Sequence, residues 1–275
     1  MTDVAEVENV STPAAEPTGE GRLHLTGVTK SFGGRVVVDV DDLVLGRYGI
    51  EGIIGPNGAG KTTLMNVITQ ARRPNSGKVT YRPDKGPGVD LTGMSLDEIA
   101  RLGVVKSNQV IQMFGDMTTM DSFLLSVAPP RYEQMYRLES LTTEKRLRTD
   151  FHEEIYWYID YFGIDDPDAP ALSAGDKKLV DIIRCLLLKP RFLLLDEPTA
   201  GLPEDQTRLV MELMRKKVAE EDLSIVIIEH DLALMWEVCE FVHFMADGKV
   251  VEQGPPQAIR ESATVAAKYL GHSDE

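Results

Sequence analysis

A glycine-rich segment that follows an apolar run constrains the fold of this chain more than any other feature. Residues 55–62 have the sequence Gly-Pro-Asn-Gly-Ala-Gly-Lys-Thr, residues 50–54 form the apolar run, and residues 62–69 are typical of a helix. Glycines let the backbone curl with its N–H groups turned inward, and the following helix N-terminus adds free donors and partial positive charge. A strand, this loop and a helix in that order predict a P-loop, which binds nucleotide phosphates.

The end of this motif carries the residues with specific chemistry. Lys61 is expected to hold the β- and γ-phosphates, and Thr62 is expected to give its hydroxyl to Mg²⁺. The alternative is a glycine-rich turn that only links a strand to a helix. The predicted nucleotide contacts in this segment are Gly55, Pro56, Asn57, Gly58, Ala59, Gly60, Lys61, Thr62 and Thr63.

Composition and charge exclude several classes of protein. The 275 residues carry a formal net charge of −15, which argues against a broad electrostatic footprint for nucleic acid, so no nucleic-acid partner is expected. The sequence has no run of about 18 apolar residues, and its start lacks the basic and apolar regions of a signal peptide. Cys185 and Cys239 lie far apart in apolar surroundings and are expected to be packed thiols. These features favour a cytoplasmic protein.

Strand and helix patterns alternate along much of the chain. Residues 22–45 have strand patterns that predict an N-terminal antiparallel β region. Residues 192–195, 224–228 and 241–245 are predicted strands, and residues 177–188, 203–219 and 231–240 are predicted helices. This alternation predicts an α/β fold with a mainly parallel sheet, the RecA-like core of P-loop NTPases.

The ends of the domain and one insertion are marked by changes in composition. Residues 1–20 are acidic, contain no Lys or Arg, and are expected to form a disordered tail. Strand patterns give way to long charged amphipathic stretches in the region 113–188, which is therefore interpreted as a helical subdomain inserted in the core. The nucleotide-binding domain as a whole is expected to span residues 21–271.

Two adjacent carboxylates follow the predicted strand 192–195. Asp196 is a candidate ligand of Mg²⁺, directly or through water, and Glu197 is suited to orient and deprotonate an attacking water. The alternative is a strand that ends in solvated acids. The P-loop upstream makes the catalytic interpretation the better one.

A second anion site is indicated about twenty residues before these acids. Ser173 is a candidate N-cap, and together with Gly175 and the helix N-terminus it could bind a phosphate. The sequence Leu-Ser-Ala-Gly-Asp, a helix, and then Leu-Leu-Leu-Asp-Glu-Pro-Thr-Ala-Gly-Leu resembles the nucleotide-binding subunits of ABC (ATP-binding cassette) proteins. The resemblance covers essentially all of residues 21–271.

The resemblance implies ATP and Mg²⁺ as cofactors, ATPase activity, and further site residues. Phe32 matches the aromatic residue that stacks on adenine, and residues 200–203 match the D-loop. Gln109 matches the Q-loop glutamine, with a catalytic and a Mg²⁺-binding role, and His230 matches the switch histidine that contacts the γ-phosphate. Taken singly, Phe32 could be a strand-end hydrophobe, Gln109 a surface residue and His230 a hydrogen-bonded core histidine.

In this family two domains meet head to tail, and each completes the other's site. The resemblance therefore implies that Ser173, Ala174 and Gly175 contact ATP in trans, on an identical or homologous second subunit. The family signature is usually Leu-Ser-Gly-Gly-Gln, so Ala174 and Asp176 depart from it. A carboxylate at position 176 suits the helix dipole, but it would repel a nearby γ-phosphate unless it turns aside, and slow turnover is expected.

The C-terminal region narrows the resemblance to one branch of the family. Residues 252–259 and 265–271 are similar to the tails of ATP-binding subunits of branched-chain or hydrophobic amino-acid importers and their urea-uptake relatives. This implies a peripheral protein at the cytoplasmic face of the cell membrane, with integral membrane permease subunits and an extracytoplasmic substrate-binding protein as partners. An apolar stretch that either docks a permease helix or packs the helical subdomain contains Met113, Phe114, Met117, Met120 and Phe123.

Other functions within the superfamily remain as alternatives. A soluble ABC ATPase of iron–sulfur cluster assembly would copurify with soluble scaffold proteins, whereas a transporter subunit would copurify with membrane proteins. An ABC ATPase that energises another membrane system is a further alternative. A DNA-repair or chromosome ATPase is opposed by the lack of long coiled-coil heptads and zinc-type cysteine pairs.

Overall fold

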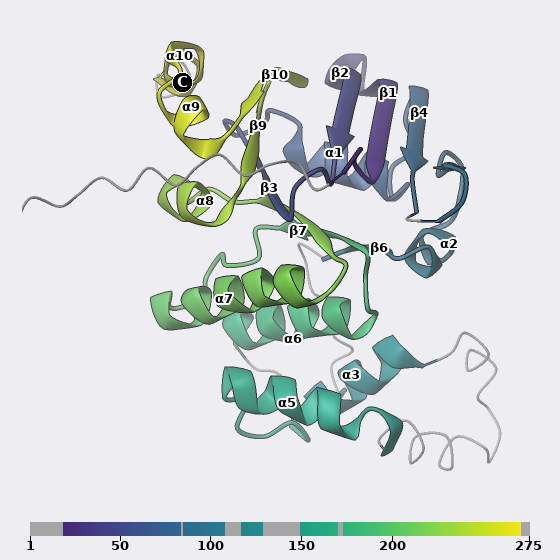
Figure 1. The fold of residues 1–275 in the computed structure, drawn as a ribbon, viewed down its shortest axis with the longest axis vertical. Coiled ribbons are helices and arrows are strands. Elements are labelled where there is room, and N and C mark those ends of the chain that lie inside the picture. The colour runs from purple at the N-terminus through teal and green to yellow at the C-terminus, as the bar shows by residue number, and fades with distance from the viewer. Residues whose placement is uncertain (1–18, 84, 108–116, 129–148, 170–172, 271–275) are drawn as a thin grey trace, which may run out of the picture.

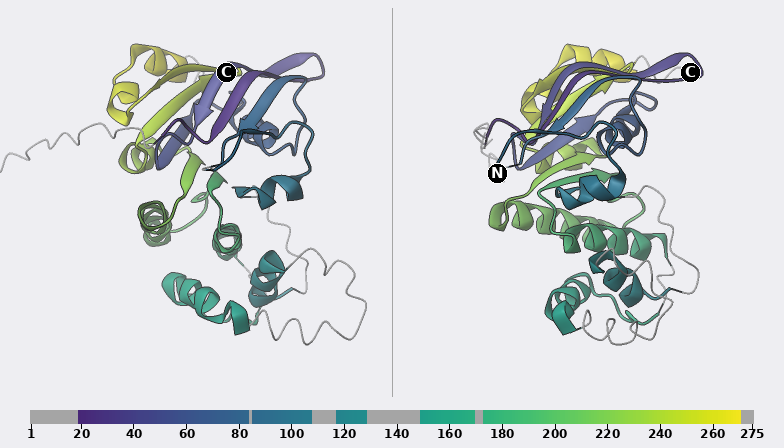
Figure 2. Two further views of the ribbon diagram at one scale, coloured as in Figure 1. Left: turned by 45° about the vertical axis from the view of Figure 1, so that its right-hand side comes forward. Right: turned by 90° about the vertical axis from the view of Figure 1, so that its right-hand side faces the viewer.

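Two β-sheets and a set of helices make up the fold (Figures 1 and 2). The computed structural model describes residues 19–83, 85–107, 117–128, 149–169 and 173–270. The predicted tail 1–20 lies outside these residues except for its last two. Among the described helices, none combines the length and the apolar character that a bilayer span requires.

The larger sheet has six strands in the order β10-β9-β3-β8-β7-β6. Its strands are β3 (Ile50–Ile54), β6 (Val104–Lys106), β7 (Phe192–Asp196), β8 (Ser224–Ile228), β9 (Phe241–Ala246) and β10 (Lys249–Gly254). All neighbouring pairs from β9 to β6 are parallel, and only β10 runs antiparallel to its neighbour β9. The predicted mainly parallel sheet is therefore confirmed.

The smaller sheet is antiparallel, as expected for the N-terminal region, in the order β2-β1-β4-β5. Its strands are β1 (Leu23–Phe32), β2 (Arg35–Leu45), β4 (Ser76–Tyr81) and β5 (Val89–Asp90). Acidic residues interrupt the apolar pattern of β2, but the strand continues through them. Apolar Val38, Val40 and Leu43 point inward, while Asp41 and Asp42 stay exposed.

Both faces of the parallel sheet are covered, which explains why its central strands are mainly apolar. Leu193 and Leu195 of β7 join a core with helices α6, α7 and α8. Phe192 and Leu194 point to the opposite face and join a core with α1 and the antiparallel sheet. The helices are α1 (Lys61–Ile68), α2 (Leu96–Arg101), α3 (Thr119–Val127), α5 (His152–Phe162), α6 (Ala174–Leu187), α7 (Glu204–Glu220), α8 (Leu232–Val238), α9 (Pro256–Arg260) and α10 (Ala263–Leu270).

Helices α3 and α5 lie beyond α6, on the side away from the sheets (Figures 1 and 2). Met120 and Phe123 of α3 are buried in this helical region. Of the two interpretations of the apolar stretch, packing of the helical subdomain therefore holds for these two residues. Met113 and Phe114 lie outside the described residues. The boundaries of the helical subdomain at about 113 and 188 stay a prediction.

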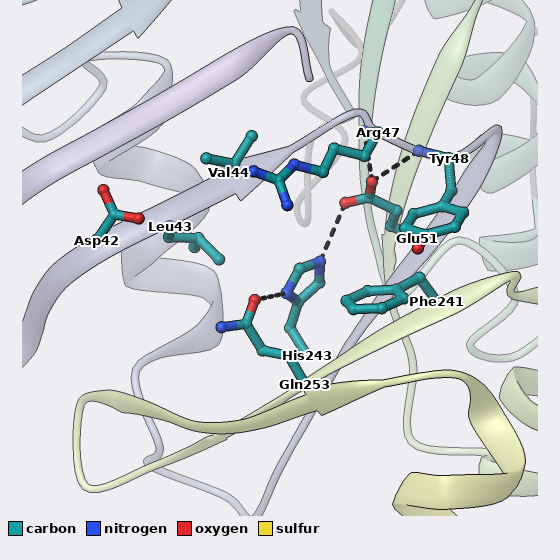
Figure 3. A pocket seen from close by; sticks show the side chains of 9 residues that line it. All are labelled: Asp42, Leu43, Val44, Arg47, Tyr48, Glu51, Phe241, His243 and Gln253. Carbon is teal, nitrogen blue, oxygen red and sulfur yellow. Dashed lines mark hydrogen bonds and ion pairs between the residues drawn. The ribbon is translucent and has the colours of Figure 1, made fainter. Parts of the chain in front are cut away.

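A buried polar network fixes the beginning of β3, the strand that leads into the P-loop (Figure 3). Glu51 accepts hydrogen bonds from the backbone N–H groups of Arg47 (2.7 Å) and Tyr48 (3.0 Å). Its other oxygen lies 3.0 Å from Nε2 of His243, whose Nδ1 lies 2.9 Å from the side-chain oxygen of Gln253. The network borders a small cavity of about 130 Å³. Three strands are thereby joined through side chains as well as through the sheet.

Candidate active site

The glycine-rich loop connects the end of β3 to the beginning of α1, as the sequence predicted. Gly55 and Gly60 have φ values of 152° and 98°, a region that side-chain-bearing residues rarely adopt. A Cβ atom at Gly55 would clash with the carbonyl oxygen of Met245, and one at Gly60 would clash with that of Val37. Both glycines are therefore required by the close packing of the loop against its neighbours.

Lys61 is folded into this loop. Its side-chain Nζ donates to the carbonyl oxygens of Gly55 (2.6 Å) and Pro56 (3.0 Å), and the residue is only 6% exposed. Burial lowers the pKa of Lys61, and the negative charges of Glu197 and Asp196 offset part of this lowering. The two carboxylates thus help to keep the buried Lys61 charged, and its positive charge suits the loop to bind an anion.

Asp196 ends β7 and is completely buried. Its Oδ1 accepts a hydrogen bond from the Thr62 hydroxyl at 3.2 Å, which brings together two residues 134 positions apart in the sequence. Its Oδ2 accepts no hydrogen bond from the described part of the chain and lies 3.6 Å from Nζ of Lys106. A buried carboxylate oxygen without a donor, beside a hydroxyl oxygen, is the kind of oxygen ligand that Mg²⁺ prefers.

Glu197 and His230 meet at the same edge of the sheet. Nε2 of His230 lies 3.0 Å from Oε1 of Glu197, and the side chains are 51% and 26% exposed, respectively. Glu197 has a φ of 52°, in the left-handed region that a non-glycine residue adopts at an energetic cost. Its backbone N–H donates to the carbonyl of Ile228 at the end of β8, so the strained residue is held in place.

The predicted signature serine caps a helix, as expected. The Ser173 hydroxyl accepts a hydrogen bond from the Asp176 N–H at 2.9 Å, and the Asp176 carboxylate accepts one from the Ser173 N–H at 3.2 Å. This is a reciprocal capping box at the N-terminus of α6, which begins at Ala174. The carboxylate of Asp176 is therefore turned back toward the first turn of its own helix.

Two other predicted site residues, Phe32 and Gln109, have no described contact with the site residues above. Phe32 ends β1 and is 45% exposed, with Nζ of Lys30 lying 5.2 Å from its ring centroid. Gln109 lies outside the described residues. Sequence reasoning missed Lys106; the available signal was a lysine that directly follows two valines.

The described residues bring the P-loop, Thr62, Asp196, Glu197 and His230 to one edge of the parallel sheet, where β3, β7 and β8 end. Such an arrangement combines donors for phosphate, oxygen ligands for a divalent cation, and a carboxylate that can accept a proton. Within the described residues no group of three or more His, Cys, Asp or Glu side chains could hold a metal by itself. A cation here would depend on nucleotide oxygens for part of its coordination.

Known proteins match along most of the chain. A family model described as ABC transporter matches residues 42–200. BraF of Pseudomonas aeruginosa, a high-affinity branched-chain amino acid transport ATP-binding protein, is 31% identical over 257 residues, which cover 91% of this chain and 98% of that protein. LivG of Escherichia coli, which has the same description, is 29% identical over 255 residues, with 91% and 98% covered. The crystal structure of a nucleotide-free ATP-binding cassette from an ABC transporter is similar with a TM-score of 0.74 at 25% identity, over 90% of this chain and 98% of that one.

Proposed function

Since this chain belongs to the ABC transporter family, it is an ATP-binding cassette ATPase, and we propose that it powers a membrane importer of branched-chain or other hydrophobic amino acids. One observation supports hydrolysis most directly: the P-loop, the Thr62–Asp196 pair and the Glu197–His230 pair lie together at one edge of the sheet. Binding alone would need the loop and Lys61, but it would not need a strained carboxylate beside an imidazole.

In the proposed reaction, the triphosphate is held by the ammonium of Lys61 and by the backbone N–H groups of residues 55–63, except Pro56, which has none. Glu197 orients a water molecule against the γ-phosphorus and accepts the proton that this water loses as its oxygen forms the new bond. His230 contacts the Glu197 carboxylate through Nε2. A contact of His230 with the γ-phosphate is proposed from the family resemblance. The bond between the γ-phosphorus and the bridging oxygen breaks, and ADP leaves with the electron pair.

The residues present fit a magnesium ion. Thr62 and Asp196 would supply its protein oxygens, and Gln109 is a further predicted ligand from outside the described residues. When bound with the nucleotide, the ion would neutralise part of the charge on the phosphate oxygens.

A second subunit completes the proposed site. The N-terminus of α6 offers the backbone N–H groups of Ala174 and Gly175, and the Ser173 hydroxyl can donate beside them, which suits a γ-phosphate bound to the partner. Phe32 is sufficiently exposed to stack on adenine. Because the chain contains each motif once, two cassettes are needed for a pair of complete sites.

The names of the relatives support the importer and its substrate class. BraF and LivG are branched-chain amino acid transport proteins, and this chain matches nearly their full length. Membrane permease subunits and an extracytoplasmic substrate-binding protein are the proposed partners, at the cytoplasmic face of the membrane. Amides or urea stay alternative substrates, since the transported molecule would not contact this subunit.

Glu197→Gln tests the hydrolytic role. The amide keeps the shape of the side chain but cannot accept the proton, so we expect an ATP-bound dimer with little hydrolysis, measured by size-exclusion chromatography and phosphate release. Glu204→Gln, an exposed acid at the beginning of α7, is the matched control and should hydrolyse ATP like the unmodified chain. A fully active Glu197→Gln variant would refute the proposed role.

Copurification tests the transport role. A mild-detergent pull-down of the tagged chain followed by mass spectrometry should recover integral membrane subunits. Recovery of soluble scaffold proteins in their place would favour iron–sulfur cluster assembly.

A further inference from the structure

We infer that Glu229 is a positioning residue that joins the loops after β7 and β8 and thereby sets the contact between Glu197 and His230. Glu229 directly follows β8, and sequence reasoning gave it no role. It is only 5% exposed, although it is an acid beside the solvent-accessible His230. The inference rests on the proposed function, because it concerns the geometry of the same hydrolytic site.

The hydrogen bonds of Glu229 connect two separate loops. Its Oε1 accepts from the backbone N–H of Thr199 at 2.7 Å and from the Thr199 hydroxyl at 2.6 Å. Its Oε2 lies 3.2 Å from the N–H of His230, which donates to it. Thr199 follows Glu197 by two residues, so one carboxylate contacts both the loop of the proposed base and the loop of the imidazole.

The other links between these loops leave the side-chain geometry free. One is the backbone hydrogen bond from Glu197 N–H to the Ile228 carbonyl, which lies at the strand ends and does not set where side chains point. The other is the Glu197–His230 contact itself, which is partly exposed and therefore weak as a restraint. Glu229 is the buried link, and its burial is favourable only because all three donors are supplied.

Its burial and its partners therefore give Glu229 control over the reaction geometry. If the Glu229 link is lost, the two loops can shift relative to each other, and the Glu197 and His230 side chains move apart. A displacement of about 1 Å can reduce a rate by about a hundredfold. The P-loop lies between β3 and α1, and in the described part of the chain neither element donates a hydrogen bond to the Glu229 carboxylate, so its binding of phosphate should be unaffected.

Glu229→Gln is the first test, in the full-length chain copurified with its partner subunits. The amide has one oxygen and one NH2 group, so it cannot accept from both Thr199 and His230. We expect kcat to fall between about tenfold and a hundredfold, while KM for ATP changes less than about twofold. Glu240→Gln is the matched control, because Glu240 also accepts a backbone N–H bond, from Gly49 at 3.1 Å, away from the site. Its kcat should stay unchanged.

A double variant separates positioning from general destabilisation. If Glu229 acts through His230 and Glu197, Glu229→Gln should have little further effect on kcat in a His230→Ala background, since coupled residues are not additive. A general loss of stability would reduce activity equally in both backgrounds. An undiminished effect there, or a kcat equal to that of Glu240→Gln, would overturn the inference.

A second site keeps the inference testable if Glu229→Gln does not fold. Thr199→Val removes the hydroxyl donor and should lower kcat at constant KM, whereas Thr199→Ser retains the donor and should restore it. Equal activity of the two variants would count against the inference. Failure of the proposed function has a different signature, because Glu197→Gln itself would then hydrolyse ATP at the unmodified rate.

Discussion

Nε2 of His230 lies 3.0 Å from Oε1 of Glu197, although the two residues belong to different strand-to-helix loops. The contact exists because β7 and β8 are adjacent parallel strands whose carboxyl ends meet at one edge. The imidazole contributes to the orientation of the carboxylate before substrate arrives, together with the buried Glu229 link between the two loops, and this favours the use of Glu197 as a base. The pair is therefore a direct target for mutation.

His230→Ala should lower kcat by about a hundredfold or more, because the carboxylate loses the group that orients it. ATP binding should change little, since the P-loop contacts remain. Steady-state kinetics together with equilibrium binding of ATP separates the two effects. His24→Ala removes another histidine that pairs with a carboxylate, Asp42, at 2.6 Å outside the site, and it should leave kcat unchanged. Equal losses in the two variants would contradict the role of His230.

Local sequence patterns predicted the parts of the site that are continuous in the chain. The P-loop needs glycines at positions 55 and 60 because neighbouring carbonyl oxygens leave no space for a side chain. Ser173 is recognisable as a cap because capping depends on residues three positions apart. The apolar strand before Asp196 is recognisable because both of its faces are buried.

Contacts between distant segments could not be predicted in the same way. The Lys106–Asp196 pair depends on β6 lying beside β7, and strand order is not encoded by the periodicity of either strand. The link from Glu229 to Thr199 likewise depends on the pairing of β7 with β8. The sequence left the direction of the Asp176 side chain open. In the structure, the hydrogen bond that the Ser173 N–H donates to the Asp176 carboxylate sets this direction.

Nucleotide binding should take up a proton in alkaline solution. Burial lowers the pKa of Lys61 below its ordinary value of 10.5. At a pH between the lowered pKa and 10.5, a substantial fraction of the molecules therefore carries a neutral Lys61. A bound triphosphate raises this pKa again, so the neutral fraction gains a proton and ATP affinity falls as pH rises through this window. Calorimetry in two buffers with different ionisation enthalpies measures the uptake.

A surface lysine provides the control for this proton uptake. Lys78 is 57% exposed in its side chain and pairs with Asp90. Lys78→Met should leave the buffer dependence of the binding enthalpy unchanged. Binding enthalpies that are independent of the buffer throughout the window would contradict the assignment to Lys61.

Removing the buried carboxylate at the beginning of β3 should destabilise the fold. Glu51→Ala leaves His243 and two backbone N–H groups without their acceptor, which should cost about 3 kcal/mol of unfolding free energy or more (Figure 3). Asp42→Ala removes an acid that is 68% exposed and pairs with His24, so it should cost less than about 1 kcal/mol. Urea unfolding of both variants makes the comparison, and equal losses would show that burial is not the cause.

Asp176→Asn should strengthen ATP-driven association of two subunits. The asparagine oxygen can still accept the Ser173 N–H, so the helix cap is retained while one negative charge is removed. The capping box keeps that charge at the N-terminus of α6, the surface proposed to meet the partner's γ-phosphate. Unit charges about 4 Å apart in water interact by about 1 kcal/mol, so we expect association to be severalfold tighter. Sedimentation of the Glu197→Gln background with ATP measures the change.

Salt and a second acid distinguish local repulsion from an effect of net charge. The gain from Asp176→Asn should shrink at high ionic strength, because salt screens charges that are separated by more than a few ångströms. Asp205→Asn makes the same change of charge in the first turn of α7, where the residue is exposed, and should not alter association. Equal gains from both variants would indicate that the overall charge of −15, and not the position of Asp176, opposes the approach of two subunits.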